Sequence, residues 1–173
     1  IDVGANVGLF TLPLAMRAGA QGRVLAFEPM AENVERLLAN VVLNGFHNVD
    51  AYAIGLGADS GTLTIQAPED LAFASARAVT KGHDVRDVKT VDCRKLDDVW
   101  KESGSPTVQV MKVDVEGAEL DVLRGAVELL SACRPVLLIE ANTPEHRAVL
   151  QSFLAAWKYE WTQPSGFCPW NFI

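Results

Sequence analysis

The chain has 173 residues, of which 49% are hydrophobic and 21% charged, and its formal net charge is −7. This length and composition are typical of a soluble globular fold, so we expect one domain over residues 1–173. The acidic balance, with no Lys/Arg run longer than Arg94-Lys95, argues against nucleic acid or an anionic membrane surface as partner, because both require concentrated positive charge.

Short apolar runs alternate with longer segments of helical periodicity. The chain opens inside a predicted strand at residues 1–3, so we expect that further residues of the same domain precede it in a longer protein. Further strands are predicted at 24–27, 49–54, 62–65, 108–113 and 135–139. Helical faces are predicted over 34–42, ending before Gly45, over 122–130, and over 144–157. Residues 67–88 have no clear period and are predicted to form a loop.

Strands that are apolar on both faces and alternate with helices are typical of a parallel sheet covered on both sides. The pattern therefore predicts a doubly wound α/β domain with right-handed crossovers. Ligands of such sheets bind beyond the carboxyl ends of the strands. Polar residues that directly follow a predicted strand are consequently the candidates for a functional site.

Composition also bears on membrane association and on the cysteines. No apolar run reaches the roughly 18 residues that a membrane-spanning helix needs, so no span is predicted. The three cysteines, Cys93, Cys133 and Cys168, are widely spaced and form no CxxC pair. This favours reduced thiols in a cytoplasmic protein over a disulfide framework or a zinc site.

The first candidate is the turn after the opening strand, which contains Asp2, Gly4, Asn6 and Gly8. Glycines at a strand-to-helix turn allow close backbone approach, and the following helix N-terminus favours an anionic group. The dinucleotide fingerprint G-x-G-x-x-G is incomplete, because Asn6 replaces its middle glycine and the third is absent. A ligand carboxylate, with its amino group near Asp2, fits this turn better than a pyrophosphate. The alternative is a glycine-rich connection that binds no ligand.

The second candidate is Glu28, which ends the next strand 20 residues after Gly8. A carboxylate at this position can accept hydrogen bonds from both hydroxyls of a ribose. The alternative is a solvated acid at a strand end. Together with the first turn, Glu28 predicts a ligand with one ribose and no pyrophosphate.

The third candidate is the stretch from Lys112 to Glu119, which lies in the sequence MKVDVEGAE at residues 111–119. Lys112, Asp114 and Glu116 share one face of the strand by its period of two, and charges in an apolar strand are costly unless paired or functional. Asp114 can accept a proton from a substrate hydroxyl, bind a cofactor amino group or hold a metal. Gly117 allows another close approach. Glu119 is either part of the site or a first-turn helix acid.

The fourth candidate is Glu140 with Asn142, after the apolar run 135–139. With Asp114 they would form an all-oxygen set suited to Mg²⁺, which can orient and acidify a hydroxyl. The alternative is an ion pair between Glu140 and Lys112. His146 is either a general base or a surface histidine.

These motifs, in this order, resemble the FkbM family of S-adenosylmethionine-dependent methyltransferases. The resemblance covers roughly residues 1–142 and rests on DVGANVGLFT, AFEPMAENVERLLANVVLNG, KLDDVW, MKVDVEGAELDVLRGA and PVLLIEAN. It implies a Rossmann-like class I methyltransferase fold that uses S-adenosyl-L-methionine to methylate a hydroxyl of a sugar, glycolipid or natural product. The resemblance is compatible with a bound Mg²⁺ but does not require one.

The resemblance also implies roles for particular residues. Asp2, Gly4, Asn6 and Gly8 would line the methionine end of the cofactor, Glu28 would hold the ribose hydroxyls, and Asp114 would lie beside the methyl donor. Asp114 or Glu116 would be the catalytic base. Residues 54–56 supply no acid for the adenine, which leaves backbone groups or Asp59 for that contact. The alternatives are an NAD-dependent oxidoreductase, a non-catalytic cofactor-binding domain and a nucleic-acid methyltransferase.

Overall fold

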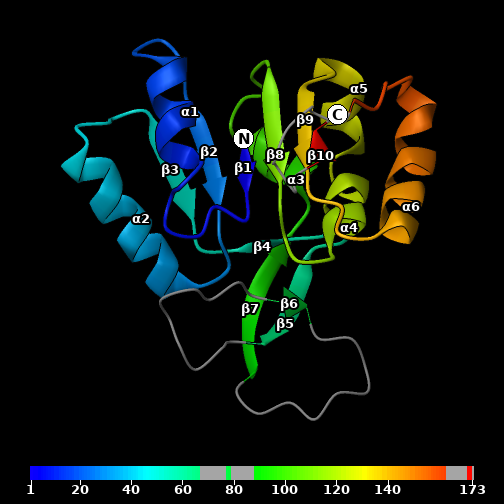
Figure 1. The fold of residues 1–173 in the computed structure, drawn as a ribbon. Helices are drawn as coiled ribbons and strands as arrows, with labels where there is room; N and C mark the ends of the chain where they lie inside the picture. Colours follow the sequence, from blue (N-terminus) through cyan, green and yellow to red (C-terminus); the bar gives the residue numbers. More distant parts are fainter. Residues whose placement is uncertain (67–76, 79–87, 163–170, 173) are drawn as a thin grey trace.

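The computed structural model describes residues 1–66, 77–78, 88–162 and 171–172. Its central sheet has six strands in the order β10-β9-β8-β1-β2-β3 (Figure 1). Their bounds are β1 (Asp2–Val3), β2 (Val24–Phe27), β3 (Val49–Tyr52), β8 (Val110–Val113), β9 (Val136–Ile139) and β10 (Asn171–Phe172). β10 runs antiparallel to β9, and all other neighbours are parallel. The predicted mostly parallel sheet is therefore confirmed.

Helices cover both faces of this sheet. They are α1 (Thr11–Ala18), α2 (Ala31–Leu43), α3 (Leu96–Glu102), α4 (Glu119–Arg124), α5 (Val127–Cys133) and α6 (Pro144–Leu154), the last followed by the 3-10 turn η1 (Ala155–Trp157). The alternation of β2 shows the two faces. Leu25 and Phe27 pack into the large core with α3 to α6, whereas Ala26 packs with Leu37 and Val41 of α2. This confirms the doubly wound architecture.

A second, smaller sheet projects beyond one edge of the central sheet (Figure 1). It consists of β4 (Gly55–Leu56), β5 (Gly61–Gln66), β6 (Arg77–Ala78) and β7 (Val88–Arg94), in the order β4-β7-β5-β6. Lys89 of β7 forms an ion pair with Glu32 in the first turn of α2, just beyond the carboxyl end of β2. The small sheet therefore reaches the edge at which the candidate site residues were predicted.

The sequence predicted only one strand of this small sheet, at 62–65 within β5. β7 was not predicted, because most of its side chains are exposed and it shows no apolar alternation. It forms through pairing along β5, from Gly61 opposite Cys93 to Gln66 opposite Val88. The predicted loop 67–88 is wrong at β6 and at Val88, and the rest of it lies outside the described residues.

The predicted single helical face over 122–130 is divided into α4 and α5. Gly125 lies at the break, where a Cβ would be 2.1 Å from the backbone oxygen of Gly57. The buried carboxylate of Asp97 then accepts hydrogen bonds from Glu128 N and Leu129 N, both at 2.9 Å. These bonds satisfy the first amides of α5, so a tertiary contact starts a new helix there.

Several smaller differences concern element ends and the cysteines. The strand predicted over 49–54 ends at Tyr52, and the one predicted from 108 begins at Val110. Cys93 and Cys133 are free thiols, and Cys168 lies outside the described residues. No helix in the described part of the chain is long and apolar enough to span a membrane.

Candidate functional site

The candidate site lies where the central sheet reverses its winding order, between β1 and β8. From β1 the sheet extends through β2 to β3 on one side and through β8 to β9 on the other. In doubly wound sheets, ligands bind in the crevice beyond the carboxyl ends of the strands at such a switch point. The residues predicted from four separate strand ends therefore meet at one edge.

The turn after β1 is fastened to both neighbouring strands. Gly4 N and Ala5 N donate hydrogen bonds to the carbonyl oxygen of Phe27 in β2, at 2.9 and 3.0 Å. Gly4 has a φ of 76°, and a Cβ at this position would lie 1.8 Å from the backbone oxygen of Asp114. The sequence suggested that a ligand approaches the backbone at this glycine. In the structure the backbone of Asp114, at the end of β8, occupies that position. Asn6 and Gly8 continue the turn with φ of 48° and 98°.

Glu28 lies directly after β2 and organises the loops around it. Its Oε2 accepts a hydrogen bond from Asn6 N at 3.0 Å, and its Oε1 accepts from Met30 N at 3.0 Å and Asn33 Nδ2 at 3.2 Å. Burial raises the pKa of Glu28, while these hydrogen bonds and the charge of Lys112 oppose the rise. A carboxylate has about four acceptor positions, so Oε2 keeps capacity for a ligand hydroxyl.

Lys112 of β8 joins the first turn to the fourth strand end. Its Nζ donates to the Gly4 carbonyl oxygen at 3.0 Å and lies 3.4 Å from Asp2 Oδ1 and 3.3 Å from Asp114 Oδ2. Asp2 is fully buried and also accepts a hydrogen bond from Thr11 Oγ1 at 2.6 Å. Lys112 thus pairs with Asp2 and Asp114 rather than with Glu140, the partner in the alternative interpretation of Glu140.

Glu140 and Asp114 lie next to each other, each directly after the end of its strand, β9 and β8. Their strands are paired in register, with Val113 opposite Ile139, so the next residues of each strand are neighbours. Burial raises the pKa of Glu140 to about 7, with further contributions from the charge and hydrogen bonding of Asp114 and from the charge of Glu116. The Oε2 atom of Glu140 is buried and has no hydrogen-bond partner in the described structure. The arrangement favours one proton held on Glu140 at moderately acidic pH.

We expect a Glu140→Gln variant to gain stability over the wild type as the pH rises. Because the folded protein raises the pKa of Glu140 from an ordinary 4.5 to about 7, the stabilisation it provides is complete below about pH 4.5 and is lost through pH 7. Glutamine mimics the neutral form at every pH. Because Glu140 is only half-buried, solvent reduces the effect, and we expect the difference in unfolding free energy to reach about 1 to 2 kcal/mol above pH 7.

Urea unfolding of both proteins between pH 5 and 8 measures this difference directly. Glu145→Gln, an exposed change on α6, is the matched control and is expected to follow the wild type. A constant difference between Glu140→Gln and the wild type across this range would contradict the assignment.

The turn between β8 and α4 is fixed by Glu119. Its buried Oε1 accepts hydrogen bonds from Val115 N at 3.1 Å and Gly117 N at 3.2 Å. Between these amides Glu116 adopts a left-handed φ of 56°. The Oε2 of Glu119 lies 3.2 Å from Nε2 of the half-buried His146 at the start of α6. Glu119 therefore orders the turn that carries Glu116, and His146 is a partner of Glu119 on a neighbouring helix.

The structure brings the predicted strand-end residues together, with one exception. Asp59 is exposed in the turn between β4 and β5, where its carbonyl oxygen accepts a weak hydrogen bond from the Cys93 thiol. The sequence also missed Thr11 and Asn33, which hold Asp2 and Glu28. Both lie in the first turn of a helix, α1 and α2, and their residue types alone do not specify a partner.

The chemistry of this edge suits a ligand that carries donors and positive charge. Asp2, Glu28, Asp114 and Glu140 present carboxylates, and Asp2 Oδ1 is buried without a hydrogen-bond partner in the described structure. An ammonium, a sulfonium and ribose hydroxyls are complementary to such groups. No group of three or more His, Cys, Asp or Glu residues that could hold a metal occurs among residues 1–66, 77–78, 88–162 and 171–172.

Comparisons with known proteins agree with this architecture. The sequence model of the FkbM methyltransferase domain matches residues 2–160. Methyltransferase sdnD from Sordaria araneosa is 33% identical over 156 residues, which cover 74% of this chain and 60% of that protein. Hexuronic acid methyltransferase AglP from Haloferax volcanii is 31% identical over 138 residues, which cover 79% of this chain and 53% of that protein. The chain thus spans somewhat more than half of each relative.

A crystal structure of methyltransferase FkbM from Methylobacillus flagellatus KT has the same fold. It aligns with a TM-score of 0.69 and 20% identity, covering 99% of this chain and 41% of that one. The strand order and the helices on both faces of the sheet define a Rossmann-like α/β domain with the fold of this methyltransferase structure. The chain belongs to the FkbM methyltransferase domain family.

Proposed function

We propose that this chain is an S-adenosylmethionine-dependent methyltransferase domain that transfers a methyl group to a hydroxyl oxygen. The match of the FkbM domain family across residues 2–160 is the observation that supports this most strongly. The acidic edge between β1 and β8 supports it independently, because a cationic cofactor with ribose hydroxyls is complementary to carboxylates.

In this proposal the chain's own residues divide the cofactor between them. Glu28 accepts a hydrogen bond from the ribose through Oε2, and the turn from Gly4 to Gly8, with Asp2 behind it, receives the methionine end. Asp114 lies opposite that turn, held by Lys112 at 3.3 Å. The bound cofactor supplies an electrophilic methyl group attached to a positively charged sulfur.

The chain's catalytic task is then to align the acceptor oxygen and to remove its proton. An aligned near-attack geometry supplies much of the rate in such transfers. Asp114 or Glu116 would accept the proton that the acceptor hydroxyl loses when its oxygen takes up the methyl group. Turnover of Asp114→Asn and Glu116→Gln variants at saturating cofactor distinguishes the two, because loss of the base lowers kcat even when the cofactor site is full.

We propose that the acceptor is a hydroxyl of a sugar, glycolipid or natural product. The named activity of the relative AglP, which methylates a hexuronic acid, supports the sugar class. We propose that the small sheet contributes to recognition of the acceptor. Its position supports this, because the ion pair between Lys89 of β7 and Glu32 of α2 holds it beside the candidate site.

Calorimetric titration of the chain with S-adenosylhomocysteine, beside NADH, tests the proposed function. We expect saturable binding of S-adenosylhomocysteine and none of NADH. Binding of NADH alone would indicate the oxidoreductase alternative. Absence of both from a chain shown to be folded by its cooperative unfolding would count against a cofactor site within these residues.

A further inference from the structure

Lys112 is a buried cation in the middle of the candidate site. It is 5% exposed and is flanked along β8 by the fully buried Met111 and Val113. Burying an ammonium among apolar residues is costly unless it is paired and hydrogen-bonded. Lys112 meets this requirement through the Gly4 carbonyl, Asp2 and Asp114, and its Nζ also lies 5.0 Å from the centre of the Phe10 ring.

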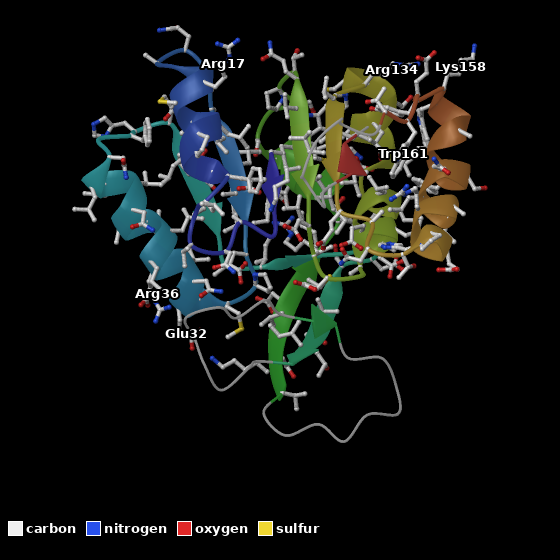
Figure 2. The ribbon with its side chains drawn as sticks, viewed as in Figure 1. Arg17, Glu32, Arg36, Arg134, Lys158 and Trp161 are labelled. Atoms are coloured by element: carbon white, nitrogen blue, oxygen red, sulfur yellow. The ribbon has the colours of Figure 1, made fainter. Side chains whose placement is uncertain are left out.

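The charges at this point do not cancel. Asp2 and Asp114 carry two carboxylates, and Lys112 is the one cation ion-paired with either of them in the described part of the chain. Figure 2 shows Arg17, Arg134 and Lys158 at the opposite end of the molecule from the small sheet, whereas Arg36 of α2 lies nearer to that sheet. Lys112 therefore decides whether this group of side chains carries one or two negative charges.

We propose that Lys112 is a specificity-determining residue, which sets how strongly the cofactor pocket prefers the positively charged methyl donor to its neutral-sulfur product. This inference rests on the proposed function. Lys112 contacts the Gly4 carbonyl and the Asp114 carboxylate, two groups that the proposed function places beside the cofactor, so its charge acts on a cofactor bound there. The charge of Lys112 reduces the attraction of the two carboxylates for a sulfonium and has little effect on a thioether. The site therefore prefers the methyl donor to its product less strongly than two carboxylates without Lys112 would.

S-adenosylmethionine and S-adenosylhomocysteine differ at the sulfur by one methyl group and one positive charge. Removing Lys112 also loosens Gly4 and Asp114, and that loss weakens both ligands alike. The ratio of the two dissociation constants removes this shared effect and reports the charge. For charges several ångströms apart in a partly buried site, Coulomb's law gives a change in this ratio of about three- to thirtyfold.

The experiment is calorimetric titration of each variant with S-adenosylmethionine and with S-adenosylhomocysteine, in the absence of an acceptor. In Lys112→Met we expect the preference for S-adenosylmethionine to rise about three- to thirtyfold over the wild type. In Lys112→Arg, which keeps the charge, we expect the wild-type ratio. Lys101→Met removes the same charge from an exposed ion pair between Lys101 of α3 and Glu128 of α5, and is expected to leave the ratio unchanged.

An unchanged ratio in Lys112→Met would overturn the inference, whether or not both affinities fall. If Lys112→Met does not fold, Lys112→Gln makes the same comparison, because its amide can donate to the Gly4 carbonyl without a charge. Failure of the proposed function is distinguishable, since the wild-type chain would then bind neither ligand and no ratio would exist.

Discussion

Replacing Glu28 by alanine is expected to weaken binding of S-adenosylhomocysteine at least about hundredfold. The substitution removes a charged acceptor for the ribose hydroxyls, and hydrogen bonds to charged groups contribute about 1.5 to 3 kcal/mol each. It also frees Asn6 N, which Glu28 holds at 3.0 Å and which fixes the turn that receives the methionine end. Calorimetry gives both the dissociation constant and the fraction of binding-competent protein.

Two further variants separate a ligand contact from a structural role of Glu28. Glu32→Ala makes the same substitution one turn away, at an exposed residue of α2 paired with Lys89, and is expected to bind normally. Glu28→Gln keeps the shape of the side chain, but its amide NH₂ group would face Asn6 N or Met30 N, which are themselves donors. We therefore expect this variant to bind S-adenosylhomocysteine more weakly as well. If Glu28→Ala lowered only the folded fraction and left the affinity of the remainder intact, Glu28 would be a purely structural acid.

Replacing Gly4 by alanine is expected to destabilise the chain by more than about 3 kcal/mol. Two costs combine at this position. The φ of 76° is unfavourable for a residue with a Cβ, and that Cβ would lie 1.8 Å from the Asp114 backbone oxygen, where it must push β1 and β8 apart. Because these strands form the switch point, ligand binding is expected to be lost with stability.

Gly45→Ala is the matched control for this substitution. Gly45 has a similar φ of 69°, after the end of α2, but a Cβ there meets nothing within 4 Å. Only the backbone cost of about 1 to 2 kcal/mol should remain. Urea unfolding of the two variants measures the difference, and equal losses would show that the contact with Asp114 is unimportant.

Much of the central sheet was predictable because strands that are buried on both faces consist of apolar residues. β2 has four residues, all buried, since both of its faces are covered, and this produces a continuous apolar run. The composition of β7 in the small sheet gives no such indication. Most of the side chains of β7 are exposed, so only its pairing with β5 makes it a strand. The break between α4 and α5 was missed for a related reason, because Gly57 and Asp97 are distant in sequence.

The candidate site divides in the same way. Asp2, Glu28, Asp114 and Glu140 could be identified from sequence, because a charged residue at the end of an apolar run is costly without a use or a partner. Their partners could not. The sequence suggested Glu140 for Lys112, whereas the folded chain pairs Lys112 with Asp2 and Asp114. It likewise left His146 either as a base or as a surface residue, and the structure places it beside Glu119.

The amino-acid sequence by itself determined the doubly wound fold, the family resemblance and the set of polar residues at one edge of the sheet. These follow from local periodicity and from residues adjacent in the chain. Tertiary structure alone decided which of these residues contact one another, that Asp2 Oδ1 has no hydrogen-bond partner in the described structure, and that Lys112 pairs with two carboxylates. Ion pairs and hydrogen bonds depend on separations of about 3 Å between groups from different strands, and no pattern along one strand specifies them.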